Sequence, residues 1–344
     1  MGISLAAREP VFREALEELD ALIRQRAGWS LLTELAAPPE RSRLDHTEYA
    51  QPAIFAIEVA LARLLRSWGV IPAAVTGHSA GEVAAAHLAE VLDLKEAVRM
   101  VVCRGRLLEA AAGQGGMATV RLPASAVAAE IAPLSDAVSI AAINGPRATV
   151  ISGRVPAVQV LADGWRKRGI GCRPLPVNYA FHSTLMQPLS ETLVRELGTV
   201  RTAPPTIPIL STVFGRTAAG REFDAAYWGW NVRRPVLFEA ALRDAFRMGL
   251  EHVVEIGPHP VLIAAIAECL SAAGIGGGVY GSLRRHQDER ASLAMSLQAL
   301  YAAGYPVFRE ALYPKPAGTD WMPPASRRIV RASGRKLSGG RVAG

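Results

Sequence analysis

Residues 77–81, Gly-His-Ser-Ala-Gly, place a serine hydroxyl in the spacing G-x-S-x-G, which suits covalent catalysis. The glycines allow a turn too tight for a Cβ, and such a turn holds the serine above a sheet at a helix N-terminus. The helix end adds positive partial charge, and the N–H of Ala80 can face a developing oxyanion. A plain glycine-rich turn would have the same letters, so the pattern predicts Ser79 as a nucleophile only if partners lie near it.

A serine nucleophile needs a base, and the chain has seven histidines. His182 stands where the chain returns from a compact strand-and-helix segment, and such a connection borders a cleft of the kind in which active sites form. His259, within residues 257–260 (Gly-Pro-His-Pro), is the second candidate. His78 precedes the serine and would point elsewhere in such a turn. Each histidine could also be a buried structural residue, and position alone does not decide between these interpretations.

Arg104 falls on the apolar face of a helix predicted over residues 94–112. At about 100° per residue, it lies within about 60° of the apolar stripe. A guanidinium cannot be neutralised and is costly to bury alone. Either it pairs with an Asp or Glu of this chain, or its planar fork binds a substrate carboxylate. Beside a nucleophilic serine, the second alternative predicts an acyl donor with a free carboxylate. The stripe consists of Ala97, Met100, Val101 and Leu108.

The elements that must position these residues alternate between strand and helix. Such alternation predicts a mostly parallel sheet covered on both faces, here an α/β-hydrolase-like large subdomain built from residues 1–115 and 184–312. The predicted strands are residues 73–76, 207–213, 252–256 and 279–282. The predicted helices are 52–68, 82–91, 94–112, 236–247, 261–273 and 289–303, with 1–18 as part of an amphipathic helix.

Residues 116–183 follow a different order of elements. Hydrophobic periodicity predicts strand, helix, strand, strand, helix and strand in turn, which is the order of a ferredoxin-like unit. We therefore predict a small subdomain inserted into the larger one. Residues 313–344 are rich in Pro, Gly and basic side chains and are predicted to be a linker with a disordered basic tail. The six elements are 117–122, 124–132, 138–143, 149–152, 156–168 and 172–177.

Composition excludes several classes of protein. The 344 residues are 50% hydrophobic, enough for one large core and a smaller one. The sequence has no apolar run long enough to predict a membrane span, and its N-terminus lacks the pattern of a signal peptide. Three scattered cysteines without metal-ligand spacing are typical of a reducing cytosol. Of the net charge of +7, six units lie in the last 18 residues, so the folded body does not predict a nucleic-acid-binding face.

Eight segments resemble, in order, motifs of the malonyl-CoA:acyl-carrier-protein transacylase family. The resemblance is greatest to the acyltransferase domains of modular type I polyketide synthases. It covers almost the whole chain. The segments are residues 47–53 (T-x-x-x-Q-P-A), 77–82 (G-H-S-x-G-E), 103–107, 115–117 (G-G-M), 142–146 (A-x-N-G-P), 179–183, 230–236 and 255–262.

The resemblance implies a role for each candidate residue. Ser79 would be the nucleophile, His182 its general base, and Arg104 the ligand of a malonyl carboxylate. A backbone carbonyl near Gly257 would orient His182, where a hydrolase uses an acid. Other residues would bind the substrate, with the Ala80 N–H as oxyanion donor: Gln51, His78, Met117, Tyr179 and Phe181.

The implied reaction is ping-pong: acylation of the serine by malonyl-CoA, then transfer to the phosphopantetheine thiol of an acyl carrier protein. The expected partners are that carrier and adjoining polyketide synthase modules. Neither metal nor redox cofactor is needed, and no nucleic acid or membrane is involved. Phe181 and Ala80 are similar to malonyl-selective members, whereas Tyr179 is more like the methylmalonyl type. We favour malonyl over methylmalonyl, but one methyl is worth only about 1–3 kcal/mol, so the selection need not be strict.

Two features depart from the family pattern. The family usually opens with a strand and G-x-G-x-Q, whose glutamine N–H completes the oxyanion hole, but here the resemblance begins after it. Loss of such a donor costs on the order of 3 kcal/mol, so we expect a misplaced start, a cut domain or an impaired enzyme. Beyond Trp321 a basic tail replaces the usual linker. The alternatives are therefore a catalytically impaired acyltransferase fragment, or an α/β-hydrolase-type thioesterase or esterase, which has no use for an inward Arg104.

Overall fold

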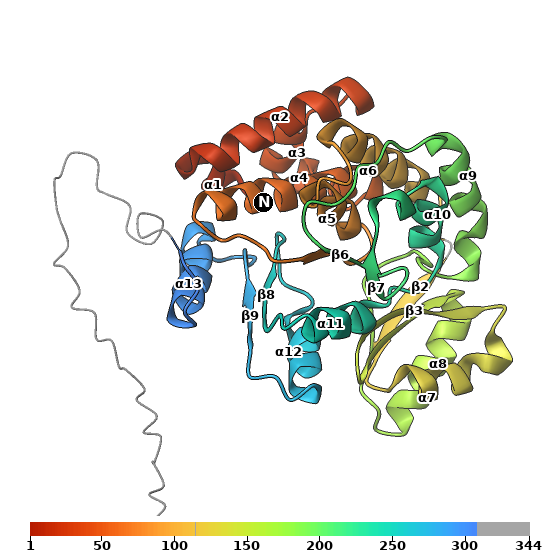
Figure 1. Ribbon diagram of the computed structural model, residues 1–344. Helices are drawn as coiled ribbons and strands as arrows, with labels where there is room; N and C mark the ends of the chain where they lie inside the picture. The colour runs from red at the N-terminus through yellow and green to blue at the C-terminus, as the bar shows by residue number, and fades with distance from the viewer. Residues whose placement is uncertain (114, 308–344) are drawn as a thin grey trace, which may run out of the picture.

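Helices from the first third of the chain form a layer above the strands (Figure 1), in a computed structural model that describes residues 1–113 and 115–307. The helix predicted over residues 1–18 is interrupted at Glu9, which is extended. A residue before proline is pushed out of the helical region, and Pro10 then starts the next helix where its missing N–H is harmless. The helices are α1 (Ile3–Arg8), α2 (Pro10–Ala27), α3 (Leu31–Ala36) and α4 (Thr47–Ser67).

Helix α4 is the centre of this layer, and α2, α5 (Gly81–Leu88) and α6 (Leu94–Glu109) pack against it. The apolar face of α6 buries Met100 and Val101, and burial of such side chains stabilises the fold by about 1.5–3 kcal/mol each. This packing fixes the rotation of α6 and turns Arg104, which lies on the same face, toward the interior.

The strands of the large subdomain form two small sheets. Strands β1 (Val75–Thr76) and β6 (Ile209–Ser211) are parallel, as are β8 (His252–Glu255) and β9 (Gly278–Gly281), so the predicted parallel pairing is confirmed. Strand β7 (Arg216–Ala218), which we did not predict, pairs antiparallel with β6. Among the described residues, β1 and β8 each pair with one neighbouring strand.

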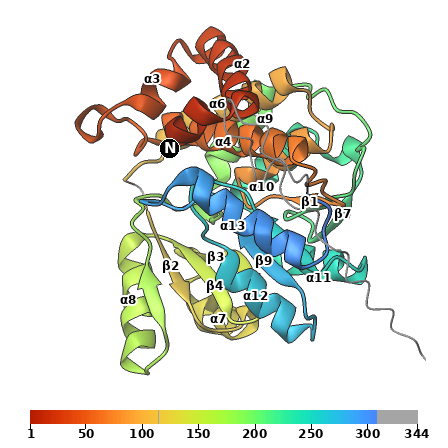
Figure 2. The same cartoon turned by 90° about the vertical axis from the view of Figure 1, so that its left-hand side faces the viewer.

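The second half of the described chain contributes five α-helices, of which three contact these strands and the other two pack against each other. The sequence predicted three of them correctly in type and place, α11, α12 and α13, but not α9 and α10. Figure 2 shows α13 lying beside β9, and the Glu289 carboxylate at its start accepts hydrogen bonds from the backbone N–H groups of Gly2 (2.7 Å) and Leu5 (2.9 Å). The helices are α9 (Gln187–Leu197), α10 (Ala225–Arg233), α11 (Phe238–Arg247), α12 (Ile263–Ala272) and α13 (Glu289–Ala302).

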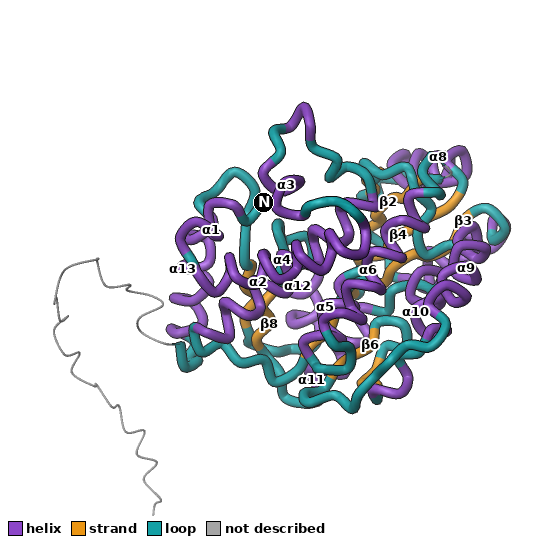
Figure 3. Tube along the Cα trace, turned by 90° about the horizontal axis from the view of Figure 1, so that it is seen from above, coloured by secondary structure: helices purple, strands orange, loops and turns teal. Residues whose placement is uncertain are grey.

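The predicted ferredoxin-like unit is confirmed. Its four strands form one antiparallel sheet in the order β3-β4-β2-β5, which is the order that a β-α-β-β-α-β unit gives when its two helices cover one face. Figure 3 shows this sheet on the opposite side of the molecule from β8. The elements are β2 (Gly116–Val120), α7 (Ala124–Ile131), β3 (Val138–Gly145), β4 (Ala148–Gly153), α8 (Val155–Lys167) and β5 (Cys172–Pro174).

Within the residues described, no helix is long and apolar enough to cross a bilayer. The predicted tail, residues 313–344, lies outside the described residues, and the predicted division of the chain at residues 116 and 183 stays a prediction.

Candidate active site

Ser79 lies on a sharp turn between β1 and α5. Its backbone φ is 54°, in the left-handed region that costs a non-glycine residue about 1–3 kcal/mol. Gly77 makes the turn possible, because a Cβ at this position would lie 2.3 Å from the backbone nitrogen of Glu82. A nucleophile elbow holds its serine in a strained conformation between a strand and a helix N-terminus. The turn at Ser79 therefore matches the elbow in its backbone geometry as well as in its sequence.

His182 approaches this serine from a distant part of the sequence. Its Nε2 lies 2.8 Å from Ser79 Oγ, and its Nδ1 lies 2.9 Å from the carbonyl oxygen of Arg234. Because a carbonyl oxygen can only accept, Nδ1 carries the proton and Nε2 presents its lone pair to the serine hydroxyl. Burial lowers the pKa of His182 to about 3, with a further contribution from the charge of Arg104. The imidazole is therefore neutral and able to accept a proton.

The orienting group of His182 differs from the sequence prediction. A carbonyl near Gly257 was expected, and this prediction is wrong: the N–H and C=O of Gly257 both bond the Ser282 hydroxyl, at 2.9 and 3.0 Å. The carbonyl that faces His182 belongs to Arg234, the residue that follows α10. The second candidate base, His259, is exposed and accepts a hydrogen bond from the N–H of Arg285 at 3.4 Å instead.

Arg104 reaches the same serine from α6. Only 3% of its surface is exposed; Nη2 donates to Ser79 Oγ at 2.9 Å, and Nη1 donates to the side-chain oxygen of Gln51. No ion pair among residues 1–113 and 115–307 includes Arg104. Burial lowers its pKa to about 10, and Glu82 raises it in part. The structure thus holds a buried cation without a carboxylate in contact.

A buried polar network supports the turn from below. The Glu82 carboxylate, which is fully buried, accepts hydrogen bonds from Thr212 N (2.7 Å), Tyr227 Oη (2.5 Å) and Asn231 Nδ2 (2.7 Å). The same amide also donates to the carbonyl oxygen of Ser79 at 3.2 Å. Burial raises the pKa of Glu82, although each of these bonds opposes that shift. Sequence reasoning missed Asn231, whose segment, residues 230–236, was recognised without a role for the residue.

The other predicted residues divide between the site and its surroundings. The Ala80 N–H stands at the start of α5 and has no acceptor in the described part of the chain. His78 turns away from the serine, and its Nε2 lies 2.8 Å from Asn144 Oδ1 on β3. Met117, on β2, packs with the apolar cluster that includes Val236.

Tyr179 and Phe181, in the segment that carries His182, form a stacked aromatic pair. Their ring centroids are 4.6 Å apart and the planes differ by 10°. The Tyr179 hydroxyl donates to Glu109 at 3.1 Å, and the same carboxylate accepts from the N–H of Thr47 at 2.6 Å. Glu109 therefore connects the end of α6, the start of α4 and the segment that carries His182.

Comparison with known proteins decides the family. The family profile described as "Acyl transferase domain" matches residues 1–305. The chain belongs to this acyl transferase domain family. The curated relatives include erythronolide synthase EryA2 of Saccharopolyspora erythraea, 34% identical over 95% of this chain and 10% of that protein. Polyketide synthase GfsE of Streptomyces halstedii is 38% identical over 93% of this chain and 8% of its own length. The chain therefore spans a tenth or less of these two relatives.

Solved structures of acyl transferase domains share the fold. The acyltransferase domain from module 8 of the salinomycin polyketide synthase has a TM-score of 0.85 at 34% identity, covering 88% of this chain and 71% of that one. A loading acyltransferase from the avermectin polyketide synthase has a TM-score of 0.83 at 35% identity, covering 88% and 95%. MCAT from Streptococcus pneumoniae has a TM-score of 0.76 at 27% identity, covering 87% and 95%. The chain is an acyltransferase domain of the polyketide synthase type.

Proposed function

We propose that this acyltransferase domain carries a malonyl unit from coenzyme A to an acyl carrier protein through an ester on Ser79. The observation that carries the proposal is the buried guanidinium of Arg104, which lies 2.9 Å from the serine oxygen and contacts no carboxylate of the described residues. An acyl group attached to Ser79 Oγ can place a carboxylate at its far end against this cation. The two hydrogen bonds of such a fork are stronger than neutral ones.

The geometry supports a two-step transfer. Ser79 Oγ attacks the thioester carbon, His182 Nε2 takes the serine proton, and the Ala80 N–H faces the oxyanion as the C–S bond breaks. The proton then passes from His182 to the departing thiolate. In the second step, the same nitrogen takes the proton of the carrier thiol, which attacks the ester carbonyl, and returns it to Ser79 Oγ. The carbonyl of Arg234 holds the imidazole in one tautomer throughout.

The stacked aromatic pair supports malonyl over methylmalonyl. The ring of Phe181 lies against Tyr179, and the hydroxyl of Tyr179 is bonded to Glu109. The ring of Phe181 is therefore held in place and leaves less room for an α-methyl group. Because a methyl contributes only about 1–3 kcal/mol to discrimination, the preference is one of degree.

Intact-mass measurement tests the proposal directly. The protein is incubated separately with malonyl-CoA, methylmalonyl-CoA and acetyl-CoA, with Ser79→Ala as the control for the site of labelling. One malonyl group on the wild type, none on the variant and little acetylation is the expected result. Equal acetylation would contradict the role of Arg104, and no label at all would favour an impaired fragment. Release of free malonate without transfer to a carrier would favour a thioesterase.

A further inference from the structure

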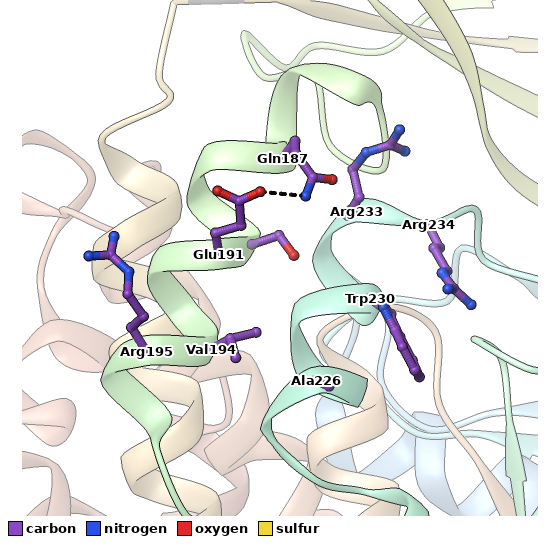
Figure 4. A pocket seen from close by; sticks show the side chains of 9 residues that line it. Gln187, Glu191, Val194, Arg195, Ala226, Trp230, Arg233 and Arg234 are labelled. Atoms are coloured by element: carbon purple, nitrogen blue, oxygen red, sulfur yellow. Dashed lines mark hydrogen bonds between the residues drawn. The ribbon is translucent and has the colours of Figure 1, made fainter.

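A cleft of about 610 Å³ lies between α9 and α10 (Figure 4). Val194, Ala226 and Trp230 contribute its apolar surface, and Trp230 is 37% exposed. Three arginines also line the cleft. The three are Arg195 on α9, Arg233 at the end of α10 and Arg234 just after it.

Three arginines without a carboxylate partner among the described residues lie together at this one cleft. Twelve others form an ion pair, whereas no ion pair of the described residues includes Arg195, Arg233 or Arg234. Arg195 donates to the hydroxyl of Thr192 at 2.9 Å. Arg234 lies over the ring of Trp230, 4.2 Å from its centroid. The three arginines and the single carboxylate Glu191 leave the lining of the cleft with an excess of positive charge.

The other groups of the cleft offset only part of this charge, because one carboxylate faces three guanidinium groups. Its one carboxylate, Glu191, accepts a hydrogen bond from Gln187 at 2.8 Å, as Figure 4 shows. The buried Nε of Arg233 has no partner within the described residues. Burial and the neighbouring charge of Arg234 lower the pKa of Arg233. An anionic occupant would relieve this repulsion.

The cleft is continuous with the segment that holds the catalytic histidine. The carbonyl oxygen of Arg234 receives the hydrogen bond from His182 Nδ1, and the carbonyl of Val232 accepts from the His182 N–H at 3.2 Å. A molecule bound between α9 and α10 therefore contacts the outer side of residues whose backbone orients the base. This position suits a partner whose attached chain must reach Ser79.

We infer that the α9/α10 cleft docks an acidic helical surface of the acyl carrier protein that accepts the acyl group. The inference rests on the proposed function. An apolar centre containing a tryptophan, surrounded by arginines, matches the composition of protein–protein interfaces. Unpaired cations at the rim steer an acidic partner and raise its association rate in a salt-dependent way.

Charge reversal at Arg195 tests the inference without touching the catalytic residues. The matched control is Arg26→Glu, because Arg26 is also an exposed arginine in the last turn of a helix and is outside every ion pair of the described residues. Binding of an unmodified acyl carrier protein from a polyketide synthase is measured by calorimetry at two salt concentrations. We expect Arg195→Glu to weaken binding about tenfold and to reduce its salt dependence. The control should bind as the wild type does.

Measuring the two half-reactions separately distinguishes binding of the carrier from binding of coenzyme A. Arg195→Glu should leave acylation of Ser79 by malonyl-CoA unchanged and raise the KM for the carrier about tenfold, an effect that a Glu→Lys carrier variant should reverse. A raised KM for malonyl-CoA alone would assign the cleft to coenzyme A phosphates and overturn the inference. Unchanged carrier binding would also overturn it. If the wild type binds the carrier but is never acylated, the proposed function fails while the docking inference stands.

Discussion

Replacement of Arg104 by methionine separates recognition of the acyl carboxylate from the chemistry at Ser79. Methionine keeps an unbranched apolar side chain in a position that is only 3% exposed and removes the charge and both donors. Two charge-assisted hydrogen bonds are worth about 1.5–3 kcal/mol each. Their loss corresponds to about 3–6 kcal/mol, or roughly 10²–10⁴-fold in kcat/KM for malonyl-CoA.

The comparison substrate makes this prediction specific. Acetyl-CoA has no carboxylate, so its kcat/KM should fall far less, and the malonyl-to-acetyl ratio should drop by most of the same factor. Stability should not fall, because a buried cation without a paired anion is costly to keep in the interior. Thermal denaturation and single-turnover acylation measure the two effects.

A matched variant on the same helix controls for general damage to α6. Arg106 forms an exposed pair with Glu196, and exposed pairs contribute about 0–1 kcal/mol, so Arg106→Met should leave both substrates unaffected. Equal losses for malonyl-CoA and acetyl-CoA in Arg104→Met would refute the reasoning, because Arg104 would then act by positioning Ser79. Retention of malonyl-CoA activity within about threefold would refute it as well.

Three further predictions follow from the same site. Ser79→Gly should abolish acylation yet raise the free energy of unfolding by about 1 kcal/mol over Ser79→Ala, because only glycine is unstrained at a φ of 54°; equal melting temperatures would contradict this. Tyr179→Phe removes the hydrogen bond to Glu109, so transfer of methylmalonyl should rise severalfold when malonyl-CoA and methylmalonyl-CoA compete. An unchanged ratio of methylmalonyl to malonyl transfer would contradict the idea that this bond holds the Phe181 ring in place. Because the pKa of His182 is lowered to about 3, kcat/KM should stay level from pH 8 down to about 5, and a protonation step near 6.5 would show that the histidine is not desolvated as described.

The sequence predicted the parts of the site that depend on local periodicity. The spacing of Gly77, Ser79 and Gly81 sets the turn, and the helical repeat of α6 places Arg104 on a buried face. Both patterns are short-range, so they need no knowledge of the remaining fold. Sequence periodicity also gave the order of elements in the ferredoxin-like unit.

The parts that sequence reasoning missed depend on contacts between distant segments. The carbonyl that orients His182 is a backbone group, which any residue at position 234 would supply. The identity of residue 234 therefore does not indicate this role. The role of Asn231 follows only from its hydrogen bonds to Glu82 and to the Ser79 carbonyl, which the sequence does not reveal. The short antiparallel strand β7 depends on its pairing with β6. Helix α9, by contrast, buries Ser190, Leu193 and Leu197 at helical spacing, so its periodicity could have predicted it.

The hydrogen bond between His78 and Asn144 has a consequence for building hybrid enzymes. His78 precedes the nucleophile on the large subdomain, whereas Asn144 belongs to the antiparallel sheet of the small one. A chimera that exchanges only the small sheet with that of another synthase must therefore bring an amide to this position. Without it, the imidazole beside the nucleophile would be buried with an unmet donor or acceptor, a penalty of about 1–3 kcal/mol. A chimera that exchanges the small subdomain must therefore preserve the contact between His78 and residue 144, whatever the surface of the exchanged sheet.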